Sequence, residues 1–270
     1  MTEETVLDTA HAAMQADLED DGARLAFYGH LADGELFLLL KEESRGESVN
    51  PELFELEAGE DAPPDRYVLV FDQEDRLAAF AEGPAPYAAL PGRVIAAMVA
   101  GSGIGLGVNL GVAPSSILIP AAAVDWLAQT LGPAPEEVEG QVRALEPPTG
   151  LSDRLITGLS TKLAVAAGLC DHAVLARALY DDQSEGLVLA FIDAAEGSES
   201  ALARAAQEAM TFSGADQRLD VAFFASGDEV TTRLAKVGLR FDMPEPEPEP
   251  EAPSVRPAPG SDPSKPPILK

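Results

Sequence analysis

The spacing of apolar residues predicts helices and short strands in the first part of the chain. Apolar side chains recur at helical intervals over residues 4–18, which predicts a helix. Asp20 or Asp21 can cap a second helix, because a short acidic side chain accepts hydrogen bonds from free backbone amides. The apolar run at 35–40 has the length of a buried strand, and Leu-Phe-Glu-Leu at 53–56 is a second candidate strand.

Two stretches have the pattern of a β-hairpin, in which apolar runs flank a few polar residues. The first is 66–81, where the polar residues are Gln73–Asp75. The second joins 172–181 to 186–193 through a polar turn with the sequence Asp-Gln-Ser-Glu. We therefore expect one hairpin in each half of the chain.

The stretch 94–124 contains no charged residue. Its length raises the possibility of a membrane span, but five glycines and two prolines would break a helix of that length. A buried core segment fits better. The expected elements are a helix at 94–100, a glycine turn, strands at 106–110 and 117–119, and a helix at 121–131.

A second folded unit follows the proline-rich and acidic stretch 132–150, which is typical of a linker. Leucines recur every four residues from Leu151 to Leu163, as on one face of a helix. After the second hairpin, the pattern predicts a helix at 198–211, a strand at 219–226, a short helix at 228–238 and an extended piece at 239–241. This order is plausible for a sheet that helices cover on one face.

These elements predict an α+β protein with two domains, each a mixed or antiparallel sheet packed against helices. The predicted boundaries are 1–131 and 151–243, separated by the linker at 132–150. After Met243 the chain is rich in Pro and Glu. Such a segment cannot bury a core, so 244–270 is expected to be a disordered tail.

The glycine-rich sequence Gly-Ser-Gly-Ile-Gly-Leu-Gly at 101–107 resembles a phosphate-binding loop at first sight. However, no set of these glycines has the spacing of the dinucleotide fingerprint, and they are expected to follow a helix and enter a strand. The alternative is backbone geometry. Gly101 and Gly103 can take positive φ in a turn, Gly105 and Gly107 leave a strand face bare for close packing, and Asn109 suits the next turn.

Charge and cysteine content limit the classes of function. The net charge is −28, and the tail after Met243 contributes only −2 of it. Such an acidic body repels nucleic acid and anionic lipid, and no cluster of bases offers a nucleic-acid site. The acidity serves solubility or salt adaptation, or it forms a docking surface for a basic partner. The single cysteine rules out an internal disulfide, and the acidic N-terminus lacks the pattern of a signal peptide, so we expect a cytoplasmic protein.

The motifs of the first unit resemble those of a bacterial family. The run Glu-Leu-Phe-Leu-Leu-Leu, the Leu-Pro-Gly-Arg at 90–93, and Gly-Leu-Gly-Val-Asn-Leu-Gly followed by an apolar strand and proline are similar to the N-terminal domain of the SseB, or enhanced-serine-sensitivity, family. The likeness covers about residues 5–131. Residues 154–241 resemble the C-terminal SseB domain more loosely. The resemblance implies a two-domain α+β cytoplasmic protein with no established enzymatic activity, and it supplies no catalytic residues.

Few residues are candidates for chemistry. Cys170 and His172 would share one face of a strand, where they could form a nucleophile pair or simply belong to the core. The three histidines have no spacing suited to a metal, so we expect no metal and no cofactor. Arg93 is an isolated base at a helix start, and it is expected to pair with a nearby carboxylate or to receive an anionic ligand or a partner's acid.

These observations favour a non-enzymatic binding or regulatory protein with a protein partner. The candidate binding residues are Arg93, Gly105, Gly107 and Asn109, since a glycine-bare strand face could line a cleft beside them. An alternative is a sensor of a small metabolite related to amino acids. A further alternative is an enzyme that uses Cys170 and His172.

Overall fold

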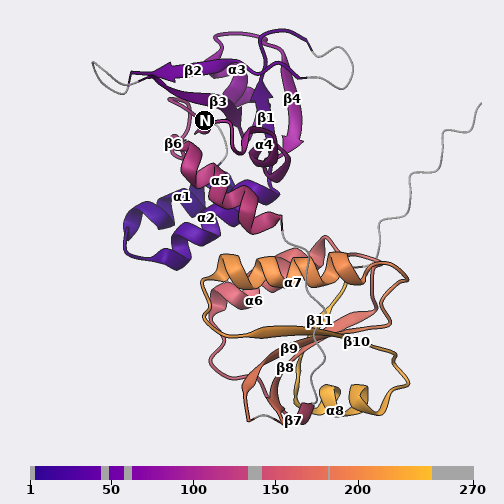
Figure 1. Cartoon of the computed structure of the whole chain (residues 1–270). Helices are drawn as coiled ribbons and strands as arrows, with labels where there is room; N and C mark the ends of the chain where they lie inside the picture. The colour runs from indigo at the N-terminus through magenta and orange to yellow at the C-terminus, as the bar shows by residue number, and fades with distance from the viewer. Residues whose placement is uncertain (1–3, 44–48, 58–62, 133–141, 182, 245–270) are drawn as a thin grey trace, which may run out of the picture.

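The chain forms two α+β units, as the sequence predicts (Figure 1). The computed structural model describes residues 4–43, 49–57, 63–132, 142–181 and 183–244. Each unit contains one mixed sheet with helices packed against it. The predicted tail lies outside the described residues, apart from its first residue.

The N-terminal unit holds five helices and six strands within the described part of the chain. The helices are α1 (Val6–Ala16), α2 (Asp21–Asp33), α3 (Glu74–Phe80), α4 (Gly92–Val99) and α5 (Ala121–Leu131). The strands are β1 (Glu35–Leu39), β2 (Leu53–Leu56), β3 (Asp65–Phe71), β4 (Tyr87–Pro91), β5 (Ile104–Val108) and β6 (Ile117–Ile119).

The sheet of the N-terminal unit has the strand order β4-β1-β3-β5-β6, and β2 also pairs with β3. The central pair β3–β5 is parallel and the other pairs are antiparallel. A large apolar cluster lies between this sheet and α1, α2, α4 and α5, while a smaller one lies on the opposite face under α3. The sheet is therefore buried on both faces, which is why its central strands are apolar along their length.

Local capping explains where the first two helices begin. The Thr5 hydroxyl accepts a hydrogen bond from the Asp8 amide, and the Asp8 carboxylate accepts one from the Thr5 amide, which is a complete capping box at the start of α1. Asp20 caps α2 by accepting from the Ala23 amide at 3.0 Å. Of the two candidate caps, Asp20 and Asp21, the structure uses Asp20.

The glycine-rich stretch shapes the backbone, as its geometric interpretation predicts. Gly101 and Gly103 have φ values of 72° and 70° in the turn between α4 and β5. Gly105 and Gly107 lie on β5 and are packed closely. A Cβ on Gly105 would stand 2.3 Å from the Ile119 carbonyl oxygen, which no real contact allows.

The C-terminal unit holds three helices and five strands within the residues described. In chain order they are β7 (Val142–Glu146), α6 (Asp153–Ala164), β8 (His172–Tyr180), β9 (Glu185–Ile192), α7 (Glu199–Ser213), β10 (Leu219–Phe224), α8 (Glu229–Val237) and β11 (Leu239–Asp242). The sheet order is β10-β9-β8-β11, with β7 also paired to β8. The predicted hairpin over 172–193 is confirmed as β8 and β9.

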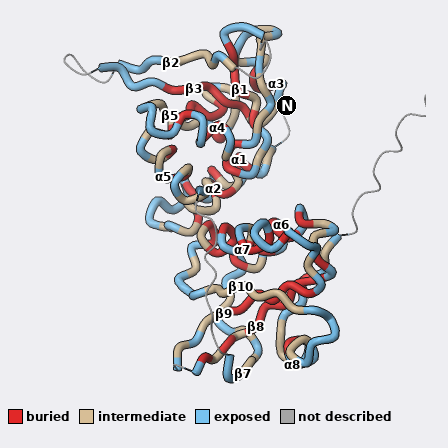
Figure 2. The backbone as a smooth tube through the Cα atoms, turned by 45° about the vertical axis from the view of Figure 1, so that its right-hand side comes forward, coloured by how far each residue is buried: buried red, intermediate tan, exposed pale blue. Residues whose placement is uncertain are grey.

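Helices cover both faces of the C-terminal sheet, which corrects the expectation of a single covered face. Helices α6 and α7 pack on one apolar cluster, and α8 packs on another through Leu234 and Val230 (Figures 1 and 2). Successive residues of β8 and β9 are buried on alternate faces. The continuous apolar sequences of the two strands fit a sheet that is covered on both faces.

Two other predictions are wrong in detail. The second half of the predicted hairpin at 66–81 is helix α3, whose first turn carries Glu74 and Asp75. Acidic residues favour a helix N-terminus, so the polar residues start a helix and do not form a hairpin turn. The predicted linker contains strand β7, which pairs with β8 from Val142 to Glu146, while 133–141 lies outside the described residues.

The two units pack through α2 and α7. A Cβ on Gly29 of α2 would stand 3.0 Å from the Cβ of Phe212 of α7, so glycine lets the two helices approach closely. Phe212 is buried and belongs to the apolar cluster of the N-terminal unit. Nearby, a Cβ on Gly214 would lie 2.9 Å from the Cα of Gly22. The C-terminal unit thus contributes an aromatic side chain to the core of its neighbour.

Candidate functional site

Arg93 lies in an ion cluster at the junction of the two units. Its guanidinium donates two hydrogen bonds to Glu208 of α7, at 3.0 and 2.9 Å, and one to Asp33 of α2 at 2.5 Å. The ammonium of Lys162 on α6 lies 2.5 Å from Glu208 and 2.7 Å from Asp33. The cluster holds two positive and two negative side chains from both units, so its formal charge is balanced.

The surroundings of Glu208 determine its charge state. Burial alone would raise the pKa of this carboxyl, but hydrogen bonds from Arg93 and Lys162 outweigh burial and hold the pKa below its ordinary value of 4.5. The hydrogen bond to Glu208 is the largest cause that raises the pKa of Arg93. Glu208 and Arg93 are therefore both charged at neutral pH. The paired carboxylate expected for Arg93 is present, and one of its two partners comes from the other unit.

Asn109 belongs to a second polar cluster, which is buried inside the N-terminal unit. Its side-chain oxygen accepts from the Asp72 amide at 3.1 Å, and its side-chain nitrogen donates to the Ser115 hydroxyl at 2.8 Å. Ser115 in turn donates to Asp8. Asn109 is fully buried and has a φ of 49°, a conformation that asparagine tolerates better than most residues.

Arg76 is the positive charge of this buried cluster. Its guanidinium contacts Asp8 at 2.5 and 3.1 Å and Asp72 at 2.8 Å, while Arg76 and Asp8 are only 1% and 2% exposed. Burial would raise the pKa of Asp8, but hydrogen bonds from Arg76, Ser115 and the Thr5 amide hold it well below its usual range. The cluster fastens α1, α3 and the end of β5 together.

The four predicted binding residues do not form one site. Gly105 and Gly107 pack against Tyr67, Leu69 and Leu110, and no open cleft separates them from their neighbours. Asn109 lies inside the buried cluster, and Arg93 lies at the junction. The structure therefore brings Asn109 together with Asp8 and Arg76, and Arg93 together with Glu208, and it joins neither pair to the glycines.

Of the two alternatives for Cys170 and His172, the structure favours a cysteine that belongs to the core. Cys170 precedes β8 and is 7% exposed within the apolar cluster beneath α6 and α7. Burial, with a smaller effect of Asp171, raises the pKa of the thiol to about 11, so it is protonated at neutral pH. His172 lies 2.6 Å from the neighbouring Asp171 carboxylate through Nδ1. Within the described residues, no hydrogen bond joins Cys170 to His172.

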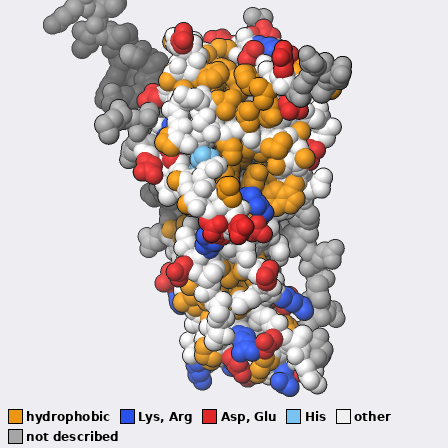
Figure 3. Space-filling view, turned by 90° about the vertical axis from the view of Figure 1, so that its left-hand side faces the viewer, with side chains coloured by type: hydrophobic (Ala, Val, Ile, Leu, Met, Phe, Trp, Pro, Cys, Tyr) orange, Lys and Arg blue, Asp and Glu red, His pale blue; other side chains and the backbone are white. Residues whose placement is uncertain are grey.

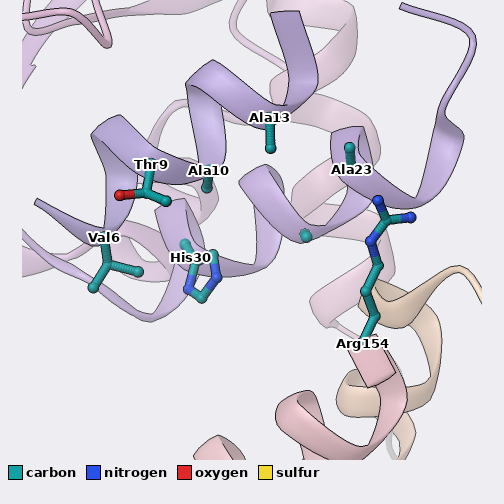
Figure 4. Close-up of a pocket in the computed structure, with 8 residues that line it drawn as sticks. Val6, Thr9, Ala10, Ala13, Ala23, His30 and Arg154 are labelled. Atoms are coloured by element: carbon teal, nitrogen blue, oxygen red, sulfur yellow. The ribbon is translucent and has the colours of Figure 1, made fainter. Parts of the chain in front are cut away.

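A shallow pocket of about 270 Å³ lies where α1, α2 and the start of α6 meet (Figure 4). Its wall is mostly small and apolar, and its polar members are Thr9, His30 and Arg154. Arg154 is bound to Asp20 at 2.5 and 2.8 Å. Burial lowers the pKa of His30; Asp33 opposes this to a smaller extent and Lys162 adds to it, so the imidazole is neutral at neutral pH. The other lining residues are Val6, Ala10, Ala13, Ala23 and Ala26.

Exposed apolar side chains are concentrated on the N-terminal unit. Figure 3 shows hydrophobic side chains gathered over that unit, above a band of acidic and basic side chains. Among the described residues, eight of the eleven large exposed hydrophobic side chains belong to it. These eight are Val6, Leu18, Phe54, Leu56, Tyr87, Val94, Met98 and Trp126. Apolar surface of this kind marks interaction sites more often than catalytic ones.

Within the described ranges, no three His, Cys, Asp or Glu side chains gather as a metal site would require. In the same ranges, no helix has both the length and the apolar character needed to cross a bilayer.

Sequence reasoning missed most members of both polar clusters. One motif was available for Asp8, since Thr5-Val-Leu-Asp8 has the spacing of a capping box. Nothing local distinguishes Lys162, which follows the leucine pattern of α6, or Glu208 in the middle of α7. Their roles depend on contacts with the other unit.

The fold and these sites define a two-unit α+β protein whose polar groups hold its own parts together. Residues 7–126 match the family model described as the SseB protein N-terminal domain. The N-terminal unit is therefore an SseB N-terminal domain, which confirms that part of the resemblance. No match was found among curated proteins or among solved structures.

Proposed function

We propose that this chain is a non-enzymatic binding or regulatory protein of the bacterial cytoplasm, and that its partner is a protein. One observation carries the proposal. The polar residues that could do chemistry are engaged in internal contacts, whereas apolar side chains such as Met98 and Trp126 are exposed on the SseB domain. A binding surface needs exposed apolar groups, while catalysis needs accessible and activated polar ones.

We further propose that the C-terminal unit is a C-terminal SseB-like domain. The support is the order of helix, hairpin, helix and strand, together with the sequence Leu-Ala-Lys-Val-Gly-Leu-Arg-Phe at 234–241, which forms the end of α8 and most of β11. The contact between α2 and α7 would then join two halves of one functional unit.

Site-specific photocrosslinking in cells tests the protein partner. A photoreactive amino acid replaces Met98 or Trp126, which are 44% and 38% exposed, and the matched control replaces Val165, which is 85% exposed on the C-terminal unit. We expect a crosslinked species of defined mass from the first two positions and none from the control. Equal labelling at all three positions, or none at any, would contradict the proposal.

The pocket at α1 and α2 favours a second candidate function, a sensor of a small amino-acid-related metabolite. Its volume of about 270 Å³ is slightly below the usual range for ligand pockets, so it suits only a small molecule. Serine and related metabolites should then raise the melting temperature by an amount that grows with concentration. A flat response across the panel would count against the sensor.

The cysteine-dependent enzyme has the least support. A buried thiol with a raised pKa is a poor nucleophile. We expect a thiol-specific reagent to modify native Cys170 far more slowly than the unfolded chain. Rapid modification of the native protein would reopen this candidate function.

A further inference from the structure

Strand β10 lies at one edge of the C-terminal sheet. It pairs with β9 in parallel over its whole length, from Leu219 opposite Leu187 to Phe224 opposite Ile192, without a bulge. It is the terminal strand in the sheet order. All six of its residues are partly exposed, and five of them are apolar. Its other edge therefore faces away from the sheet.

Two backbone hydrogen bonds show which backbone groups of β10 point outward. The Leu187 amide donates to the Arg218 carbonyl at 2.8 Å, and the Asp193 amide donates to the Phe224 carbonyl at 2.9 Å. Backbone groups of a strand alternate in direction, so Asp220 and Ala222 also face β9. The amides and carbonyls of Leu219, Val221 and Phe223 consequently face outward, and no described residue bonds to them.

The side chains of β10 pack against apolar clusters on both faces of the sheet. Leu219, Val221 and Phe223 pack on the cluster beneath α6 and α7, and Ala222 and Phe224 pack on the cluster of α8. The strand is thus held in an extended conformation, and none of the described residues pairs with its outer edge. Such an edge binds another strand with little loss of entropy, because one side is already ordered.

This edge has few of the features that usually prevent strand addition. Proteins protect exposed edges with lysine, proline, a bulge or a very short strand. The sequence Leu-Asp-Val-Ala-Phe-Phe has neither lysine nor proline, and its pairing register with β9 is continuous. Its only charge is Asp220, which accepts hydrogen bonds from Tyr180 and Arg218.

We propose that the outer edge of β10 receives an extended segment of a partner protein, in which apolar residues alternate with basic ones. The inference rests on the proposed function and identifies how the partner is held. Apolar residues of the segment extend the row of Leu219, Val221 and Phe223. Basic residues fall on the face of Asp220, and the net charge of −28 attracts them over a longer range.

A second copy of the chain fits this edge less well. Antiparallel pairing of two β10 strands about Val221 would place the two Asp220 side chains diagonally on one face. Each copy would also bring its own charge of −28 to the contact. Like charges at such positions disfavour pairing, whereas a basic segment removes both objections.

Amide hydrogen exchange on the full chain tests the edge itself. In the free protein we expect Val221 and Phe223 to exchange roughly ten-fold or more faster than Asp220 and Ala222, because only the latter pair bonds to β9. Slow exchange at Val221 and Phe223 would show that the edge is already covered. It would overturn the inference, and sedimentation would show whether a second copy is responsible.

A labelled peptide of alternating Val and Lys, about nine residues long, tests the occupant by fluorescence anisotropy. Its matched control carries N-methyl groups on alternate residues, which keep the charge but remove the donors on one edge. We expect the control to bind roughly ten-fold or more weakly. On bound protein, the amides of Val221 and Phe223 should become protected. Equal binding of both peptides would show plain electrostatic attraction and overturn the inference.

Substitutions at Val221 complete the test. Val221→Pro removes an outward amide and leaves the bonds to β9, so it should weaken binding of the unmodified peptide. Val221→Thr keeps both shape and amide and should bind as the native chain does. If Val221→Pro binds the peptide fully, strand addition is wrong. If Val221→Pro binds the peptide fully and crosslinking at Met98 still yields a partner, the proposed function stands and only strand addition at β10 is wrong.

Discussion

The two ion clusters use the same chemistry in different surroundings. In each, one arginine binds two carboxylates, with Arg76 between Asp8 and Asp72, and Arg93 between Asp33 and Glu208. Arg76 is 1% exposed and joins elements of a single unit, whereas Arg93 is 33% exposed and joins two units. Lys162 brings a second positive charge to the second cluster, where it contacts Asp33 and Glu208.

The difference shows that burial decides the consequence of an ion pair. A buried charge that loses its partner cannot regain water, so removal of one member is very destabilising. In the second cluster Glu208 and Lys162 are also buried, but Arg93 and Asp33 are about one-third exposed, so water reaches part of this cluster and the loss is smaller. The first cluster should therefore be required for the N-terminal fold, while the second adjusts how firmly the units hold together.

The largest expected effect is that of Arg76→Met. It leaves Asp8 and Asp72 as buried carboxylates without a cation, and we expect a loss of about 3–5 kcal/mol in the free energy of unfolding. Chemical denaturation measures it. The matched control is Arg24→Met, whose pair with Asp21 is exposed. A loss no larger than the control's would remove the proposed distinction between the clusters.

A smaller loss is expected from Glu208→Gln at the junction. The substitution removes the acceptor shared by Arg93 and Lys162, and we expect about 1–3 kcal/mol. The double variant with Arg93→Met should lose less than the sum of the two single variants, because both remove the same contact. Strict additivity would show that the pair does not couple.

The effect of Glu208→Gln should also depend on pH. The pKa of Glu208 is depressed in the folded chain, so its stabilisation is complete above its ordinary value of 4.5 and is lost as pH falls through the folded-state value. The difference between the native chain and the variant should therefore shrink in acid. Denaturation curves at neutral pH and below 4.5 provide the measurement, and a difference that grows in acid would contradict it.

The smallest effect is expected for Arg154→Met at the outer part of the junction. Its pair with Asp20 joins the two units, but the two side chains are 46% and 29% exposed. We expect a fall in melting temperature smaller than that of Glu208→Gln. A fall as large as that of Glu208→Gln would mean that exposure does not rank the contacts of this junction.

Much of the fold could be predicted from local pattern. The helix at 121–131 and the strand at 117–119 have the predicted bounds, and the positive φ of Gly101 and Gly103 follows from the turn that they form. Helix α3 was predicted as a strand because its apolar residues are too few to define a period. For the pair Arg93–Glu208, the sequence predicted that Arg93 would bind a carboxylate. It did not identify Glu208 as that carboxylate.

The sequence by itself determined the class of the fold, most of its elements and the turn geometry at the glycines, because these depend on residues within a few positions of one another. Only the tertiary structure decided which charges meet. Asp8 and Arg76 are separated by 68 positions, and Arg93 and Glu208 by 115. The sequence around a charged residue does not identify its distant partner, because the burial and the neighbours that decide the pairing arise only when the chain packs.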